Sequence, residues 1–157
     1  MEKLFLGEPA SQETSSARRE ICTRRNDVVI NYRKEDFEEE VKKHTGRRGV
    51  NIVVEHVGQE VWAKSLRCLA KGGRMVCAGT TTGAEAAVNI RQIFANHHSI
   101  IGCYMGSRKE LLDVLTLFEN GRLQPVVDSV MPLEKAREAH RRLEERKQFG
   151  KVVLTME

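Results

Sequence analysis

The stretch GRMVCAGTTTGAEAAVNIRQIFANHHSIIGCYMG, residues 73–106, decides the fold of this chain. It holds two short apolar runs, residues 75–78 and 100–104, each followed by a turn that contains glycine, with a helical pattern between them. A strand, a helical crossover and a second strand form the unit that builds a parallel sheet. Ligands bind beyond the carboxyl ends of the strands in such sheets. Residues 78–83 and 105–107 follow those ends, and they are small and polar enough to let a flat ligand approach the backbone.

The alternation of strands and helices extends on both sides of this stretch. Before it, the pattern predicts strands and helices in turn, at residues 28–30, 36–44, 50–54 and 60–70. After it, Ser107 and Glu110 have the spacing of a capping box at the start of a further helix. Strands at 126–130 and 151–155, with a helix between them, complete the pattern. This order predicts an α/β fold with a parallel sheet.

The composition is that of a soluble globular domain. Of the 157 residues, 40% are apolar and 31% are charged, but only 5% are aromatic, so aliphatic side chains must form the core. No apolar run approaches the roughly 20 residues that span a bilayer. The first residues contain no apolar stretch of signal-peptide length. We therefore expect no membrane partner and a cytoplasmic location.

The net charge of +4 does not by itself indicate nucleic-acid binding. The arginines near the two ends lie among acidic residues, and aromatic side chains are not interleaved with basic ones as on nucleic-acid surfaces. We therefore expect no nucleic-acid partner. The four cysteines are widely separated and lack Cys-x2-Cys spacing, so we expect them to act as small apolar residues.

The two glycine-rich motifs that most often hold phosphate groups, Gly-x-Gly-x-x-Gly and the Walker loop, do not occur in the sequence. Of the five histidines, only His56 directly follows a predicted strand end, where a ligand would bind. Three interpretations of His56 remain open: direct chemistry, lining of a ligand site, or a surface position. We predict no catalytic residue and no metal ligands in this chain.

Four segments have an order and spacing that are specific together, although none is decisive alone. They are INYRKEDFEEEV at residues 30–41, GVNIVVEHVG at 49–58, SLRCLAKGGRMVCAGTTTG at 65–83 and LEKAREAHRRLEERKQFGKVVLT at 133–155. Over about residues 27–155 they resemble the C-terminal half of the medium-chain dehydrogenase/reductase family. The most similar branches are the zinc-type alcohol dehydrogenases and the NADPH-dependent quinone oxidoreductases.

The resemblance implies an NAD(P)-dependent oxidoreductase that moves a hydride between a nicotinamide and an alcohol, aldehyde or quinone. Family members combine a doubly wound cofactor domain with a separate catalytic domain, and the protein positions the nicotinamide and shields it from water. The positions of this chain that match the family's cofactor contacts are Tyr32, His56, Val57, Gly58, Ala78, Gly79, Thr80, Tyr104, Met105, Gly106 and Lys151.

The resemblance assigns these positions to different parts of the cofactor. The turn at 56–58 would face the adenine or the nicotinamide-side ribose. Residues 78–80 would present backbone to the carboxamide, and residues 104–106 would close over the nicotinamide ring. Lys151 would lie near the pyrophosphate.

Tyr32 matches a tyrosine that NADPH-using quinone reductases place near the 2′-phosphate. Arg33 and Lys34 would add positive charge there, so the resemblance slightly favours NADP over NAD. An ordinary strand-end role for Tyr32 remains an open alternative.

The chain also departs from the family pattern. Family members are about twice as long, and the segments without a counterpart are the catalytic domain with its zinc ligands, the first strand, the Gly-rich turn and the second strand. We therefore predict a partial doubly wound (Rossmann-type) parallel sheet that lacks its first two strands. Only the strands at 51–54, 75–78 and 100–104 would keep their family pairing, whereas those at 126–130 and 151–155 would lack their usual partners.

This comparison divides the chain into three segments. Residues 27–121 would form a partial NAD(P)-binding domain, and residues 122–157 would return to the catalytic domain. Residues 1–26 do not match the family, and their polar composition is compatible with disorder. On these grounds we expect a truncated product with little or no activity.

Two kinds of partner follow from this interpretation. An exposed strand edge favours association, so the strand at 100–104 would pair two chains into a homodimer, as it does in the family. The alternative function is therefore a non-catalytic oligomerisation module. A further chain that supplies the missing catalytic domain is the other expected partner.

Overall fold

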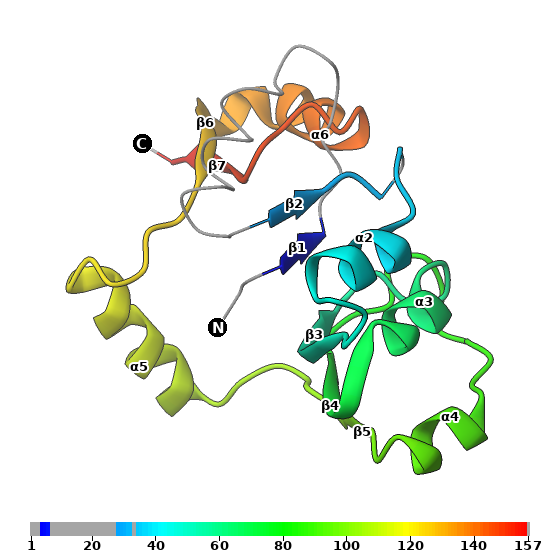
Figure 1. Cartoon of the computed structure of the whole chain (residues 1–157). Helices are drawn as coiled ribbons and strands as arrows, with labels where there is room; N and C mark the ends of the chain where they lie inside the picture. The colour runs from blue at the N-terminus through cyan, green and yellow to red at the C-terminus, as the bar shows by residue number, and fades with distance from the viewer. Residues whose placement is uncertain (1–3, 7–27, 33, 157) are drawn as a thin grey trace. The chain divides into compact units, whose positions relative to one another are not determined.

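The computed structural model describes residues 4–6, 28–32 and 34–156 (Figure 1). Two predictions concern residues outside this part. They are the disorder of residues 1–26, of which only residues 4–6 are described, and the role of Arg33. The chain divides into two compact units: unit 1 comprises Met1–Val29 and Gly106–Glu157, and unit 2 comprises Ile30–Met105. No helix in the described part is long and apolar enough to cross a bilayer.

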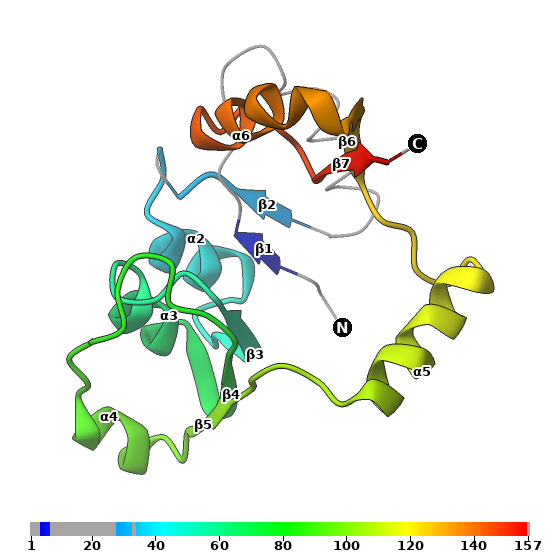
Figure 2. The same ribbon diagram turned by 180° about the vertical axis from the view of Figure 1, so that it is seen from behind.

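Unit 2 contains a three-stranded parallel sheet with the strand order β3-β4-β5. The strands are β3 (Val50–Glu55), β4 (Leu69–Cys77) and β5 (Ser99–Gly102) (Figures 1 and 2). The helices α3 (Trp62–Arg67) and α4 (Ile90–Ala95) are the crossovers between them. The prediction of a partial doubly wound sheet with these three strands paired is therefore confirmed.

Helix α2 (Phe37–His44) precedes this sheet and follows the predicted pattern. The Asp36 side chain caps it by accepting a hydrogen bond from the backbone N–H of Glu38 at 3.0 Å. Acidic side chains occupy its first turn and basic ones its last, which complements the helix dipole. Phe37 and Val41, four residues apart, are the buried side chains of the helix.

The core of unit 2 lies between α3 and the sheet. Leu66, Leu69 and Met75 form a buried cluster, and the partly buried Val53, Trp62 and Ile93 pack against it. Met75 is completely buried, with an exposed fraction of 0%. Aliphatic side chains therefore carry this core, as the low aromatic content predicts.

One prediction about this region is wrong. We expected Leu69 and Ala70 to end the helix at 60–70, but both residues belong to β4. The backbone N–H of Val50 donates a hydrogen bond to the carbonyl oxygen of Cys68 at 2.9 Å, and Val50 pairs with Leu69 in the ladder. Pairing with β3 therefore extends β4 backward over residues whose apolar spacing also fits a helix.

The other face of the sheet is exposed. Ile52, Val54 and Ile101 have exposed fractions of 51%, 68% and 44%. The register aligns Val54 with Val76 and Val76 with Ile101, so these apolar side chains form a row across the three strands. A strand that is apolar on both sides is typical of a sheet covered on both faces, but only one face of this sheet is covered by described residues.

In unit 1 the strands β6 (Val127–Pro132) and β7 (Lys151–Thr155) pair with each other in parallel. A 3-10 turn (Leu133–Lys135) and helix α6 (Ala136–Glu144) connect them. The crossover through α6 brings the two strands side by side, a pairing that the sequence pattern does not predict. The expectation that they lack their usual partners in a catalytic domain stays a prediction.

One further helix and two further strands complete the described structure. Helix α5 (Arg108–Glu119) begins with the predicted capping box, in which Ser107 and Glu110 exchange backbone and side-chain hydrogen bonds. Strand β2 (Val28–Ile30) pairs with β1 (Leu4–Leu6), a strand that the sequence pattern does not predict. β2 is therefore separate from the three-stranded sheet, as expected when its family neighbours are missing.

Candidate functional site

The candidate site is the edge of unit 2 where the three parallel strands end. Glu55 of β3 aligns with Cys77 of β4, and Cys77 aligns with Gly102 of β5. The chain therefore leaves the sheet at the same level three times. Three exit segments, residues 56–58, 78–83 and 103–105, follow side by side.

The first exit turn is held by a buried carboxylate. The backbone N–H groups of Val57 and Gly58 both donate to Glu55 Oε1, at 2.6 and 2.9 Å. Glu55 itself is only 3% exposed. Hydrogen bonds to the buried Glu55 side chain therefore hold the turn, whereas His56 is exposed.

The second exit segment is hydrogen-bonded to the first. The backbone N–H and the hydroxyl of Thr82 donate to the carbonyl oxygen of Val57, at 2.7 and 2.9 Å. The hydroxyl of Thr81 donates to the carbonyl oxygen of His56 at 3.2 Å. The backbone N–H of Gln59 donates to the carbonyl oxygen of Gly83 at 3.2 Å. The two turns thus form one continuous surface.

Glycine is required where these two turns touch. Gly58 has φ +96°, and a Cβ atom there would lie 2.6 Å from the carbonyl oxygen of Gly83 and 3.0 Å from Thr80 Cα. A Cβ atom on Gly79 would lie 2.9 Å from the carbonyl oxygen of His56. Both contacts are shorter than side chains tolerate, so the backbones can approach this closely only because these positions lack a side chain.

The third exit segment is more open. The backbone N–H of Cys103 donates to the carbonyl oxygen of Cys77 at 2.8 Å, which continues the ladder by one bond. Beyond it, the side chains of Tyr104 and Met105 are 92% and 81% exposed. Met105 has φ +54°, a left-handed conformation that is unusual for a residue with a side chain.

The structure brings together most of the residues that the sequence assigns to the cofactor. His56, Val57, Gly58, Ala78, Gly79 and Thr80 lie on the first two exit segments, and Tyr104 and Met105 lie on the third. Tyr32 follows β2, which is not a strand of this sheet. Gly106 and Lys151 belong to unit 1, so the geometry of this edge does not include them.

Three residues whose side chains hold this edge by hydrogen bonds are absent from the set assigned on sequence grounds: Glu55, Thr81 and Thr82. Glu55 is an acidic residue at the end of an otherwise nearly apolar strand, and a charged residue at such a position is a detectable signal. The two threonines belong to a run of three consecutive threonines, Thr80–Thr82. The sequence does not indicate which of their hydroxyl groups bonds to the first exit turn.

The chemistry of this edge fits the nonphosphate part of a dinucleotide. Closely packed glycine-containing turns present backbone groups to a flat ring or a ribose without a large side chain in between. The edge does not supply a phosphate cradle, because no Gly-x-Gly-x-x-Gly turn occurs in the chain. Within the described ranges, no group of three or more His, Cys, Asp or Glu side chains could hold a metal ion.

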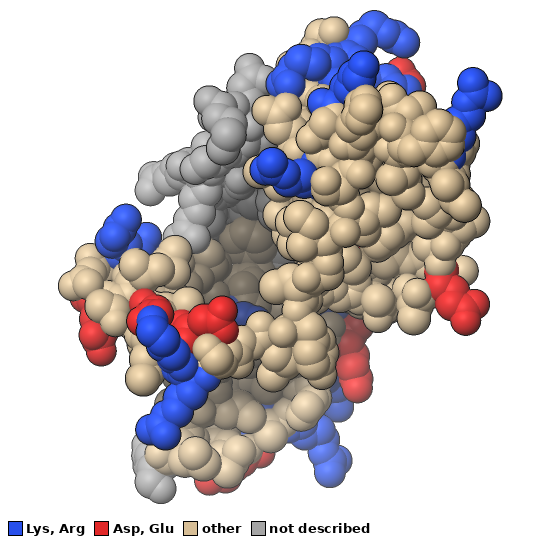
Figure 3. Space-filling view, turned by 90° about the horizontal axis from the view of Figure 1, so that it is seen from below, with Lys and Arg blue, Asp and Glu red and all other residues tan. Residues whose placement is uncertain are grey.

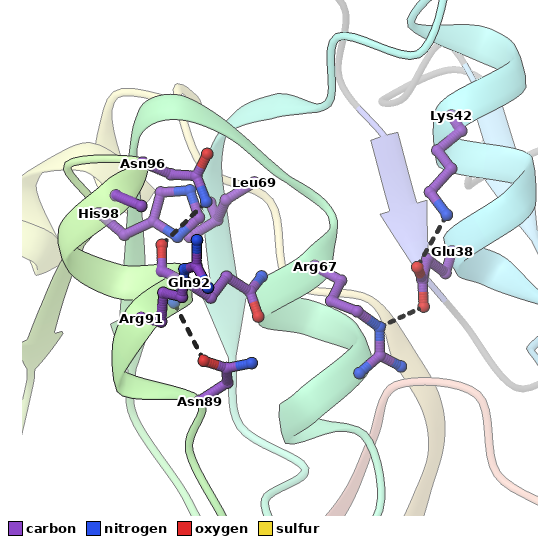
Figure 4. Close-up of a pocket in the computed structure, with 10 residues that line it drawn as sticks. Glu38, Lys42, Arg67, Leu69, Asn89, Arg91, Gln92, Asn96 and His98 are labelled. Atoms are coloured by element: carbon purple, nitrogen blue, oxygen red, sulfur yellow. Dashed lines mark hydrogen bonds and ion pairs between the residues drawn. The ribbon is translucent and has the colours of Figure 1, made fainter.

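Away from the strand-end edge, unit 2 has an open groove of about 520 Å³. Figure 4 shows its lining, which comes from α2, from the end of α3, from α4 and from the start of β4. Glu38 accepts from Lys42 at 2.8 Å and from Arg67 at 2.7 Å. Burial raises the pKa of Glu38, but these hydrogen bonds outweigh it and hold the pKa below its ordinary value. The Glu38 carboxylate therefore forms ion pairs with Lys42 and Arg67, and part of the charge in this groove is neutralised within it.

Charged side chains also lie outside this groove. On the face shown in Figure 3, basic side chains occur in several groups with acidic side chains among them. Exposed pairs such as Lys109 with Asp113, at 2.7 Å, neutralise part of this charge locally.

A family model described as zinc-binding dehydrogenase matches residues 26–154. The chain belongs to the zinc-binding dehydrogenase family. This confirms the resemblance to medium-chain dehydrogenases. The match covers about four-fifths of the sequence, and the strand-end edge described above lies within it.

Individual members of the zinc-binding dehydrogenase family support the assignment. The quinone oxidoreductase-like protein 2 of Bos taurus is 32% identical over 136 residues, which are 81% of this chain and 39% of that protein. The NAD-dependent alcohol dehydrogenase of Sulfolobus acidocaldarius is 38% identical over 118 residues, 74% of this chain and 34% of that protein.

Solved structures of dehydrogenases share the fold. The crystal structure of an NAD-dependent alcohol dehydrogenase matches with a TM-score of 0.82 and 35% identity, over 98% of this chain and 43% of that one. This chain therefore spans well under half the length of the dehydrogenases that it matches. Homology and fold together indicate an NAD(P)-dependent oxidoreductase family.

Proposed function

We propose that the strand-end edge of unit 2 binds the nicotinamide and ribose part of NADP or NAD in an oxidoreductase. The reaction would transfer a hydride between the nicotinamide and an alcohol, aldehyde or quinone. The observation that carries this proposal is the hydrogen-bonded pair of turns at 56–58 and 78–83, which presents backbone at the carboxyl ends of parallel strands.

The preformed geometry of the edge favours binding. Thr82, Thr81 and Glu55 already hold both turns, so a ligand does not have to order them. The exposed Tyr104 and Met105 belong to the next exit segment and would cover the ring from that side. Shielding of this kind keeps water away from the hydride-transfer atoms.

The substrate class comes from the relatives. One matched relative is named a quinone oxidoreductase-like protein and another an NAD-dependent alcohol dehydrogenase. Both names fit hydride exchange with a nicotinamide. We keep alcohols, aldehydes and quinones as one class, because the matched parts cover only 39% and 34% of those two proteins.

For the cofactor we favour NADP slightly over NAD. Tyr32 follows β2, and Lys34 nearby is exposed and positively charged, which suits a 2′-phosphate. Comparative calorimetric titrations with NADPH and NADH test this preference. A Lys34→Gln substitution should narrow the difference between the two cofactors, whereas equal affinities in the unsubstituted chain would contradict the preference.

We expect the 157-residue chain to bind NADPH with a dissociation constant above about 1 mM. The reason is that backbone N–H groups and a helix terminus at a Gly-rich turn supply much of the affinity for a dinucleotide. Little or no turnover should follow from such weak binding. Calorimetry tests the expectation, and a micromolar dissociation constant would overturn it.

A second candidate function is a non-catalytic association module. Strand β5 is an edge of the sheet in unit 2, and its Ile100 and Ile101 are 40% and 44% exposed. An exposed apolar edge strand is a template for pairing with another chain. Sedimentation with and without NADPH separates the two functions: a dimer that ignores the cofactor favours the module, and a shift that depends on the cofactor favours the enzyme.

A further inference from the structure

Glu55 is an acidic residue in a buried position, where an apolar side chain is much more common. It is the last residue of β3, and its exposed fraction is 3%. Its Oε1 atom accepts two hydrogen bonds, from Val57 and Gly58. Its Oε2 atom is buried and has no hydrogen-bond partner within the described part of the chain.

A buried carboxylate with one unsatisfied oxygen is unfavourable for folding. An apolar side chain of the same length would fill the position without that penalty. Glu55 differs from such a side chain in its acceptor atom, which binds two consecutive backbone N–H groups of the exit turn. Those groups could not be satisfied by the sheet ladder, because the chain has already turned away from it.

The effect of these two bonds reaches the second exit segment. Val57, which donates to Glu55, also accepts both hydrogen bonds from Thr82. Gly58, the other donor, lies against Thr80, whose Cα atom would be 3.0 Å from an added Cβ atom. The orientation of the first turn therefore sets the position of residues 78–83.

We propose that Glu55 is a positioning residue for the dinucleotide. Its carboxylate holds the turn at 56–58 by its two N–H groups, and through Val57 and Gly58 it aligns both turns that present backbone to the ligand. It touches neither the cofactor nor the substrate. This inference rests on the proposed function, but its first half, the control of turn order, is tested without any cofactor.

The test compares two substitutions of similar length by amide hydrogen exchange in the full chain. Glu55→Met fills the space and removes both acceptor oxygens, and Glu55→Gln keeps one neutral carbonyl acceptor. With Glu55→Met we expect the amides of Val57 and Gly58 to exchange at least about tenfold faster, while that of Met75 in β4 is unchanged. Glu55→Gln should give an intermediate increase at the same two amides.

The matched control is Glu38→Met. Glu38 is also a largely buried carboxylate of unit 2 that accepts two side-chain hydrogen bonds, but it lies on α2. This substitution should leave exchange at Val57 and Gly58 unchanged. Unchanged rates at Val57 and Gly58 in Glu55→Met would show that Glu55 does not order the turn. Equal acceleration at Met75 would show a general packing role. Either result would overturn the inference. If Glu55→Met does not fold, Glu55→Gln alone decides. Faster exchange confined to Val57 and Gly58 supports the inference, and equal acceleration at Met75 overturns it.

Titration with NADPH, followed by amide chemical shifts, tests the second half. We expect shifts at 56–58 and 78–80 in the unsubstituted chain, a loss of these shifts in Glu55→Met, and recovery in Glu55→Gln. Equal shifts in the unsubstituted and Glu55→Met chains would overturn the positioning role. No shifts in the unsubstituted chain at NADPH concentrations well above about 1 mM would instead overturn the proposed function, and the exchange rates would still decide whether Glu55 orders the turn.

Discussion

The backbone N–H and the hydroxyl of Thr82 both donate hydrogen bonds to the carbonyl oxygen of Val57, at 2.7 and 2.9 Å. These two residues lie 25 positions apart and follow different strands. The bonds join the exit turns of β3 and β4 directly. Hydrogen bonds within unit 2 therefore hold the backbone surface at the strand ends.

The first prediction concerns the Thr82 hydroxyl. Thr82→Val keeps the shape of the side chain but removes its bonds to Val57 and to the backbone N–H of Glu60. We expect the free energy of unfolding to fall by about 1–2 kcal/mol and NADPH-induced shifts at the two turns to weaken. The control is Thr116→Val, which removes a hydroxyl bond of α5 to Leu112. Equal weakening of the shifts in both variants would contradict a specific role.

The second prediction concerns the close approach at Gly58. Gly58→Ala adds a Cβ atom at a residue with φ +96° and 2.6 Å from the carbonyl oxygen of Gly83. We expect a loss of about 2–4 kcal/mol in the free energy of unfolding, measured by chemical denaturation. Gly102→Ala is the control, because its Cβ atom would meet nothing within 4 Å. Similar losses for both variants would show that the backbone contact is not tight.

The third prediction concerns acid stability of unit 1. The Arg142 guanidinium bonds to both oxygens of Asp128, at 2.6 and 3.1 Å, and with the N–H of Phe149 lowers the pKa of that carboxyl to about 2. The ordinary value is 3.8, so the folded state binds the proton less readily than the unfolded one. This contribution to stability is complete above about pH 4 and is lost as the pH falls toward 2.

Asp128→Asn removes this titration. We expect unit 1 to be less stable near neutral pH and to lose part of its pH dependence between about pH 4 and pH 2. Amide signals of β6 and β7 during an acid titration measure the effect. Asp113→Asn is the control, because its pair with Lys109 is exposed and contributes little. Acid profiles that are the same for the original chain and Asp128→Asn would refute the assignment.

The fourth prediction concerns association through β5. Ile101→Lys places a charge on the exposed edge strand, and we expect it to abolish any dimer seen by sedimentation. Ile90→Lys changes a residue that is even more exposed, at 73%, but lies on α4. It should leave the dimer intact. A dimer that survives Ile101→Lys would exclude pairing through this strand.

The sequence predicts the three-stranded sheet well because its strands carry strong local signals. Residues 50–54 form an almost purely apolar run, and residues 75–78 form a second apolar run that ends at the glycine at position 79. The error at Leu69 and Ala70 has a physical origin: their apolar spacing fits a helix, but their backbone pairs with β3. Pairing between distant residues overrides a local pattern, and the pattern contains no record of that pairing.

The candidate site is predictable in outline only. The position of the turns follows from the ends of the strands, and the small residues at 78–80 mark a ligand-ready turn. The bonds from Thr81 and Thr82 to residues 56–57 depend on the three-dimensional approach of two loops. Likewise, β6 pairs with β7 because the crossover through α6 brings the two strands together. The local sequence pattern of each strand does not indicate this pairing.

The most direct test of the central claim is the map of amide chemical shifts when the full chain is titrated with NADPH. The account predicts that the largest changes lie at residues 56–58 and 78–80, with changes at Tyr104 and Met105 on the adjoining segment. Changes that are absent from these turns and concentrated instead at the groove residues Arg67, Arg91 and His98 would contradict it.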